Sequence, residues 1–148
     1  MRYKKVPEVI YRKVQLLDGE CEPIGRKIEG AKDIYRYYKD IQNSAVEKFI
    51  AVYLDSRNRI LASNIIEVGT VNQANPLIRE IFRFALLNNA VALIVIHNHP
   101  SGDPIPSKED KVFSGKTKEA SEVLSIKYLD SVIIADRYYF SFAEQGLI

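Results

Sequence analysis

Two histidines, the only ones in the chain, lie one residue apart at positions 97 and 99. They follow the apolar run 91–96, which predicts a central strand covered on both faces. Residues two apart in a strand point to the same face, so His97 and His99 can direct two ring nitrogens at one point while Asn98 faces away. Neutral imidazole is a common zinc ligand, and the pair is therefore a candidate for metal binding.

A carboxylate that could join the two histidines follows them in the sequence. Residues 100–106 are rich in proline and other turn formers, which predicts a sharp reversal before Ser107 opens a new helix. Asp110 then falls in the first helical turn and could complete a His, His, Asp ligand set. Such a set leaves the fourth tetrahedral position to water, as catalytic zinc requires.

Each half of this pattern also has a purely structural interpretation. The histidines could be polar residues at the rim of a sheet. Ser107 and Asp110 fit a helix capping box, in which the side chains of the two residues satisfy each other's backbone amides. Neither half decides between structure and function alone, and together they are more specific.

The complete spacing, His-x-His, seven residues, Ser, two residues, Asp, resembles the JAMM motif. Residues 97–110 resemble its RadC version, and further similarity lies at 75–86, 89–90 and 141–147. The match covers about residues 45–148 and points to the RadC-like branch of the JAB/MPN-plus metallopeptidases. It implies a three-layer α/β fold like that of cytidine deaminases, a mixed sheet with helices on both faces. The family histidine after the aspartate matching Asp130 is replaced here by Ser131, outside the metal motif.

The resemblance also assigns catalytic roles. It identifies Glu47 as the carboxylate that activates the water, although the local sequence alone would make it a solvated glutamate at a strand start. Glu67 and Glu8 lie in strand-like runs without motif support and are weaker candidates. Ser107 is expected to stabilise the oxyanion, with helix capping as its other interpretation.

Two functions follow as hypotheses. The first is a zinc-dependent hydrolase of peptide or isopeptide bonds that uses a metal-activated water, with one Zn²⁺ per chain held by His97, His99 and Asp110 and a protein or peptide as substrate. The second is a non-catalytic adaptor, associated with DNA maintenance or repair, that keeps the fold and the metal site. A zinc deaminase needs a Pro-Cys-x-x-Cys segment that one cysteine cannot supply, and a helical His-Glu-x-x-His motif is absent.

The surrounding elements are predicted from hydrophobic periodicity and from turn and cap signals. Strands are expected at 8–17, 46–54, 60–68, 91–96, 126–135 and 138–141, and helices at 31–41, 76–88 and 107–125. Strands 46–54 and 60–68 should form a hairpin. The helix at 76–88 should start with Asn75 as its cap and Pro76 as its first residue.

Length and composition set the remaining expectations. With 148 residues and 47% hydrophobic residues, the chain predicts one domain, with an N-terminal strand and helix over 1–44, the motif-bearing part over 45–148 and no helix-hairpin-helix domain. A net charge of +2, with a small basic cluster at Arg2, Lys4 and Lys5, supports nucleic-acid binding only weakly. No membrane span or secretory leader is evident, which favours the cytoplasm. Cys21 is expected to be a free thiol, and the oligomeric state is left open.

Overall fold

The fold is built on a five-stranded sheet with the strand order β2-β1-β3-β4-β5. The computed structural model describes residues 23–68 and 74–148, so the predicted strand at 8–17 lies outside the described residues. β3 and β4 pair in parallel, and the other neighbouring strands pair antiparallel. The predicted mixed sheet is confirmed. The strands are β1 (Lys48–Leu54), β2 (Ile60–Val68), β3 (Ala92–Asn98), β4 (Lys127–Ala135) and β5 (Tyr138–Ser141).

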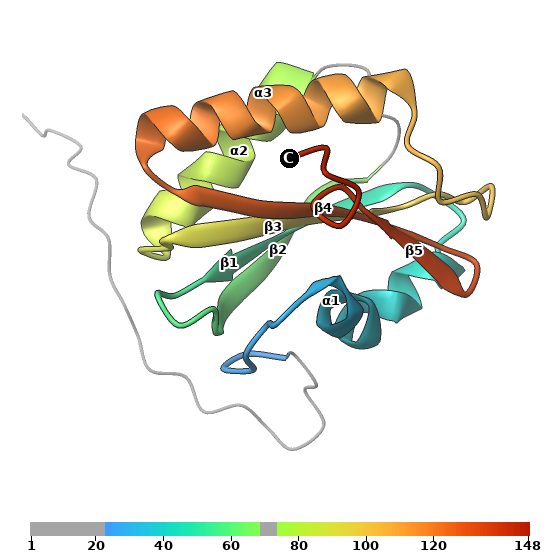
Figure 1. The fold of residues 1–148 in the computed structure, drawn as a ribbon, viewed down its shortest axis with the longest axis horizontal. Helices are drawn as coiled ribbons and strands as arrows, with labels where there is room; N and C mark the ends of the chain where they lie inside the picture. The colour runs from blue at the N-terminus through green and yellow to red at the C-terminus, as the bar shows by residue number, and fades with distance from the viewer. Residues whose placement is uncertain (1–22, 69–73) are drawn as a thin grey trace, which may run out of the picture.

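Helices cover both faces of this sheet. α1 (Ala31–Tyr38) lies on one face, and α2 (Ala74–Leu87) and α3 (Lys108–Leu124) lie side by side on the other (Figure 1). The result is the three-layer arrangement that the sequence predicted. None of the helices among the described residues is long and apolar enough to cross a membrane.

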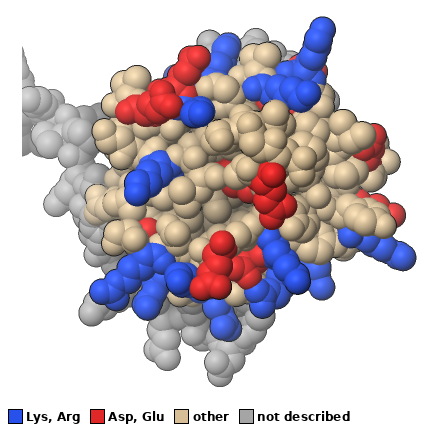
Figure 2. All heavy atoms as spheres, in the orientation of Figure 1, with Lys and Arg blue, Asp and Glu red and all other residues tan. Residues whose placement is uncertain are grey.

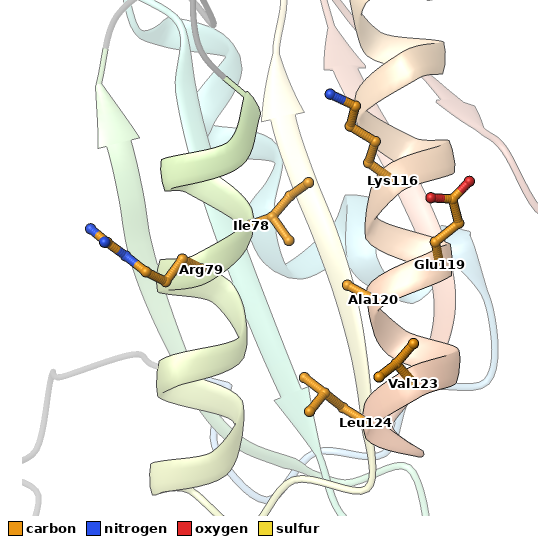
Figure 3. A pocket seen from close by; sticks show the side chains of 7 residues that line it. All are labelled: Ile78, Arg79, Lys116, Glu119, Ala120, Val123 and Leu124. Carbon is orange, nitrogen blue, oxygen red and sulfur yellow. The ribbon is translucent and has the colours of Figure 1, made fainter.

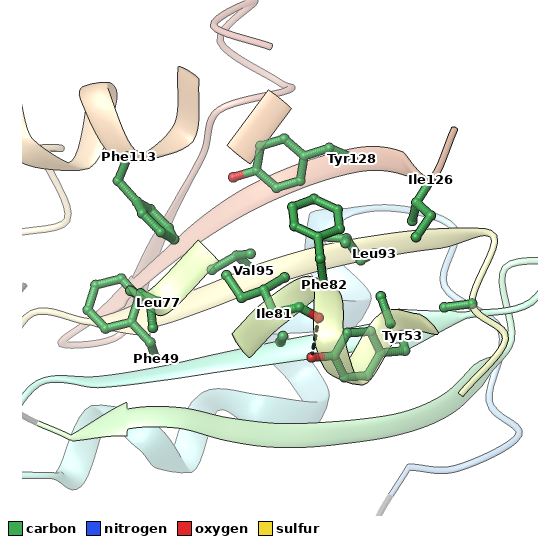
Figure 4. Packing of buried hydrophobic residues seen from close by; sticks show 13 residues of the cluster. Phe49, Tyr53, Leu77, Ile81, Phe82, Leu93, Val95, Phe113, Ile126 and Tyr128 are labelled. Carbon is green, nitrogen blue, oxygen red and sulfur yellow. Dashed lines mark hydrogen bonds between the residues drawn. The ribbon is translucent and has the colours of Figure 1, made fainter. Parts of the chain in front are cut away.

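Alternate residues of β3 face two separate cores. Leu93 and Val95 pack in the core beneath α2 and α3, which Figure 4 shows, whereas Ile94 and Ile96 pack in the core against α1. In the first core the buried Tyr53 hydroxyl donates to the main-chain carbonyl of Ile81 at 3.1 Å, which satisfies its polar end (Figure 4). Because the side-chain period of a strand is two, this alternation decides which face receives each residue at the end of β3.

Two helix boundaries differ from prediction. The helix expected at 31–41 ends at Tyr38 and continues as a 3₁₀-helix over Lys39–Asn43. Tyr38 has φ −119° and ψ 7°, outside the α-helical region, and this interrupts the regular winding. α2 begins at Ala74, so Asn75 lies in its first turn and not at the cap.

The described surface carries both charges. On the face drawn in Figure 2, Lys and Arg side chains are interspersed with Asp and Glu side chains. The basic cluster at Arg2, Lys4 and Lys5 lies outside the described residues, as does Cys21.

Candidate metal centre

The end of β3 brings the two histidines together. His97 is the sixth residue of the strand, pairs with Phe49 of β1 and Ile133 of β4, and is buried. His99 follows the strand and is partly buried. Their Nε2 atoms lie 3.2 Å apart, as expected of residues two apart on one face. β3 is longer than the predicted 91–96, so His97 belongs to the sheet itself.

Asp110 reaches this pair from the first turn of α3. Its Oδ1 lies 3.1 Å from His97 Nε2 and its Oδ2 lies 3.2 Å from His99 Nε2. The same residue closes a capping box: Asp110 N–H donates to Ser107 Oγ at 3.0 Å, and Ser107 N–H donates to Asp110 Oδ2 at 2.7 Å. The capping and the cluster geometry therefore coexist, because the box fixes the carboxylate where it faces the histidines.

The spacing of these donor atoms fits a metal ion. A tetrahedral metal with bonds of about 2.0–2.1 Å holds neighbouring ligand atoms about 3.3–3.4 Å apart. Here the two histidine Nε2 atoms lie 3.2 Å apart, and the nearest Asp110 oxygens lie 3.1 Å from His97 Nε2 (Oδ1) and 3.2 Å from His99 Nε2 (Oδ2). The side chains of His97 and Asp110 are only 1% and 7% exposed, so little solvent competes for their donor atoms. Two imidazoles and one carboxylate suit zinc and several other divalent transition metals.

A hydrogen bond fixes the ring of His99. Its Nδ1–H donates to the main-chain carbonyl of Asp103 at 2.7 Å, which leaves Nε2 as the ring nitrogen that faces the cluster. The Asp103 carboxylate instead accepts from the Ile105 amide at 2.9 Å. Asp103 thus orients a histidine through its backbone, and its side chain stabilises the turn.

The electrostatics of the cluster favour an ionised aspartate beside a neutral His97. Burial acts to raise the pKa of Asp110, but hydrogen bonds from His97 and His99 outweigh it and hold this pKa well below its usual range. Burial also acts to lower the pKa of His99, and the interactions with Asp110 and the Asp103 carbonyl reverse that effect and raise it. At His97 burial dominates and lowers the pKa, which keeps the ring in its neutral, metal-binding form.

Packing orients the ring of His97. Its Nδ1 is buried without a hydrogen-bond partner among the described protein atoms. Phe49 stacks on the ring with centroids 4.6 Å apart and planes 13° from parallel, and Phe113 meets Phe49 edge-on at 5.6 Å. Most histidine ligands are oriented by a hydrogen bond at the second nitrogen, and here an aromatic stack occupies that role. The sequence did not mark Phe49 because its contact depends on the pairing of β1 with β3.

Glu47 stands next to the three closely spaced residues. It immediately precedes β1, and its Oε1 lies 3.9 Å from His97 Nε2. One ligand atom from each of Glu47, His97, His99 and Asp110 lies within 4.8 Å of the others, and the Glu47 side chain is 21% exposed. Glu47 is thus set farther back than Asp110 and is partly open to solvent.

Of the other residues weighed from the sequence, only Ser131 has a described side chain. Glu67 pairs with Phe49 in the sheet, but its side chain is not described, and Glu8 lies outside the described residues. Ser131 is buried in β4 opposite Val95 and is not part of the cluster.

Asn98 is a further residue that the sequence did not mark. It is fully buried, its Oδ1 accepts the Lys48 amide at 2.8 Å, and its Nδ2 donates to the Val46 carbonyl at 3.1 Å. These bonds occupy backbone groups where the predicted strand 46–54 should begin, so β1 starts only at Lys48. The sequence signal that could have identified Asn98 is an asparagine in a strand of apolar residues, because the buried amide oxygen and nitrogen must both find hydrogen-bond partners.

A groove on the surface lies apart from the cluster. Figure 3 shows it between α2 and α3, with side chains from both helices on its walls. The residues that line it are Ile78, Arg79, Lys116, Glu119, Ala120, Val123 and Leu124. They include none of the four residues of the candidate metal centre.

Comparison with known proteins shows which family the sequence matches. Residues 28–147 match the family model described as RadC-like JAB domain. A UPF0758 protein of Methanosarcina mazei is 36% identical over 140 residues, which cover 94% of this chain and 61% of that protein. UPF0758 proteins of Thermotoga maritima (38% over 130 residues, 88% and 59% covered) and Trichlorobacter lovleyi (43% over 112 residues, 76% and 49% covered) are also similar. The chain thus spans about half to three fifths of these relatives, whose name states no activity.

Proposed function

Because the chain belongs to the RadC-like JAB domain family, we propose that it is a zinc-dependent hydrolase that cleaves amide bonds of a protein or peptide. The family and the cluster of Glu47, His97, His99 and Asp110 fit a metal-dependent hydrolase. The observation that carries the proposal is that the two imidazole nitrogens lie 3.2 Å apart and each lies 3.1–3.2 Å from an oxygen of the Asp110 carboxylate, while a second carboxylate, that of Glu47, is set back at 3.9 Å from His97.

In this proposal the three closely spaced residues, His97, His99 and Asp110, hold one Zn²⁺ per chain. When bound, zinc supplies a Lewis acid that lowers the pKa of water and polarises a carbonyl. Burial of the His97 and Asp110 side chains limits access by bulk water, and the capping box and the Phe49 stack hold the ligands in place.

Glu47 moves the proton. Its carboxylate is partly exposed and lies beside the ligand atoms, so it can accept a proton from the attacking water and return it to the leaving amine. The Ser107 hydroxyl accepts from the Asp110 amide and still has its own hydrogen to donate to the substrate oxygen. Glu47 immediately precedes β1, and Ser107 is the N-cap of α3.

The test separates metal binding from hydrolysis. Zinc content of the purified protein is measured by elemental analysis, and cleavage of a synthetic peptide library is followed by mass spectrometry. Wild-type protein should bind one zinc and cleave some peptides. Glu47→Gln should keep the zinc and lose roughly 100- to 10,000-fold in rate, because glutamine preserves the shape but cannot accept the proton.

Two results would contradict the proposal. A Glu47→Gln variant that cleaves at the wild-type rate removes Glu47 from catalysis. A wild-type protein that binds stoichiometric zinc and cleaves nothing favours the alternative, an adaptor that retains the site without activity.

A further inference from the structure

The residue between the two histidines points to the opposite side of the sheet. His97 lies in the core under α2 and α3, so the next residue, Asn98, faces the α1 side. There it meets the segment 44–47, which connects the 3₁₀-helix to β1. Asn98 is fully buried, and every hydrogen bond described for its side chain goes to the backbone of this segment or of Lys48.

These bonds lie on both sides of Glu47. On its N-terminal side, Asn98 Nδ2 donates to the carbonyl of Val46 at 3.1 Å and to that of Ser44 at 3.4 Å. On its C-terminal side, the Lys48 amide donates to Asn98 Oδ1 at 2.8 Å. One side chain therefore fixes the two peptide groups that flank Glu47.

The connection matters because Glu47 and the histidines come from different parts of the chain. Asn98 is covalently next to His97, so its bonds to Val46 and Lys48 relate the Glu47 backbone directly to a ligand backbone. A loose segment could carry the same carboxylate, but its distance from the ligand atoms would vary. Displacements of about 1 Å at a reacting group can cost on the order of a hundredfold in rate.

We infer that Asn98 is a positioning residue, which sets the place of the Glu47 carboxylate at the metal centre by clamping the backbone on both sides of it. This inference rests on the proposed function for the role of Glu47. The clamp itself is independent of that role, and so is the expectation that it leaves the ligands His97, His99 and Asp110 in place.

The experiment compares Asn98→Ala and Asn98→Asp with a control, Asp130→Ala. Aspartate has the shape of asparagine and keeps an acceptor for the Lys48 amide but cannot donate to Val46 or Ser44, so it remains informative if alanine prevents folding. Asp130 is also a buried clamp, because it accepts the Ala143 amide at 2.9 Å, but it holds a segment at the C-terminal end of the chain. The Asp130→Ala variant therefore shows how much of any change comes from general destabilisation of the fold.

Three readouts apply to the zinc-loaded proteins. In Asn98→Ala, hydrogen exchange at the Lys48 amide should accelerate more than tenfold. In Asp130→Ala, exchange at the Lys48 amide should not accelerate more than exchange at other amides. The zinc dissociation constant should stay within about threefold of wild type. With the best-cleaved library peptide, kcat should fall on the order of a hundredfold, with KM little changed. In the Glu47→Gln background, substituting Asn98 should not lower kcat further, because both changes disable the same step.

Each opposite outcome overturns the inference. Unchanged protection of Lys48 shows that Asn98 does not hold the segment. A zinc affinity that falls as much as kcat shows that Asn98 supports the ligands. If substituting Asn98 lowers kcat in the Glu47→Gln background as much as in wild type, Asn98 acts on a step that does not involve Glu47. If wild-type protein cleaves no peptide, the hydrolase proposal fails, and exchange together with zinc affinity still decides whether Asn98 holds the Glu47 segment.

Discussion

Replacing Ser107 by alanine should separate the structural and catalytic roles of this residue. The hydroxyl accepts the Asp110 amide at 3.0 Å as the N-cap of α3, and alanine leaves that amide without this partner. The second half of the capping box, from the Ser107 amide to Asp110 Oδ2, involves only the Ser107 backbone and remains. We therefore expect a loss of about 1 kcal/mol in unfolding free energy, a melting temperature lower by about 2–4 °C, and zinc retained.

The catalytic role predicts a larger effect, on kcat. If the hydroxyl donates to the substrate oxygen, its loss should lower kcat by roughly a hundredfold, which corresponds to about 2.7 kcal/mol of transition-state stabilisation. A shift of about 1 kcal/mol in folding cannot produce that loss while the protein remains folded at the assay temperature. The two contributions are therefore separable by size.

The assay measures kcat, zinc content and melting temperature for Ser107→Ala, Ser107→Thr and Ser107→Asp. Threonine keeps both the acceptor and the hydroxyl hydrogen and should behave much like wild type. Aspartate keeps the cap acceptor without a hydrogen to donate, so it should retain stability and lose rate. A Ser107→Ala protein that loses stability but turns over at the parent rate would refute the catalytic role and leave Ser107 as a helix cap.

Three further predictions concern the site and its surroundings. Asp110→Ala should abolish stoichiometric zinc in elemental analysis, and Asp103→Ala should retain it, because His99 bonds the main-chain carbonyl of Asp103. Phe49→Leu should weaken zinc binding by about tenfold in competition with a chromophoric chelator, because it removes the ring stacked on His97, a proposed zinc ligand. Burial raises the pKa of Asp130, so its contribution to stability is complete below the pKa of the unfolded chain and is lost as pH rises through the folded pKa. Asp130→Asn should flatten this pH dependence in urea unfolding above about pH 4.

The parts of the site that follow local rules could be predicted from the sequence. The convergence of His97 and His99 depends only on the period of a strand, and the position of Asp110 depends only on where a helix begins. Glu47 is 50 positions from His97, and family resemblance pointed to it where local sequence did not. Phe49 could not be found because its stacking on His97 requires the pairing of β1 with β3. That long-range pairing is absent from any local pattern.

The pairing of β1 with β3 itself requires an explanation, because both strands are apolar on both faces. Val52 and Leu54 face one core and Ala51 and Tyr53 the other, so a slip by one residue would exchange one apolar set for another. Hydrophobic burial therefore distinguishes the registers only weakly. A slip would separate Asn98 from its backbone partners around Glu47, and leaving such a buried group unsatisfied costs about 1–3 kcal/mol. The bonds that hold Glu47 thus also favour the register in which Phe49 lies against His97, and one buried amide couples the positions of Glu47, Phe49 and His97.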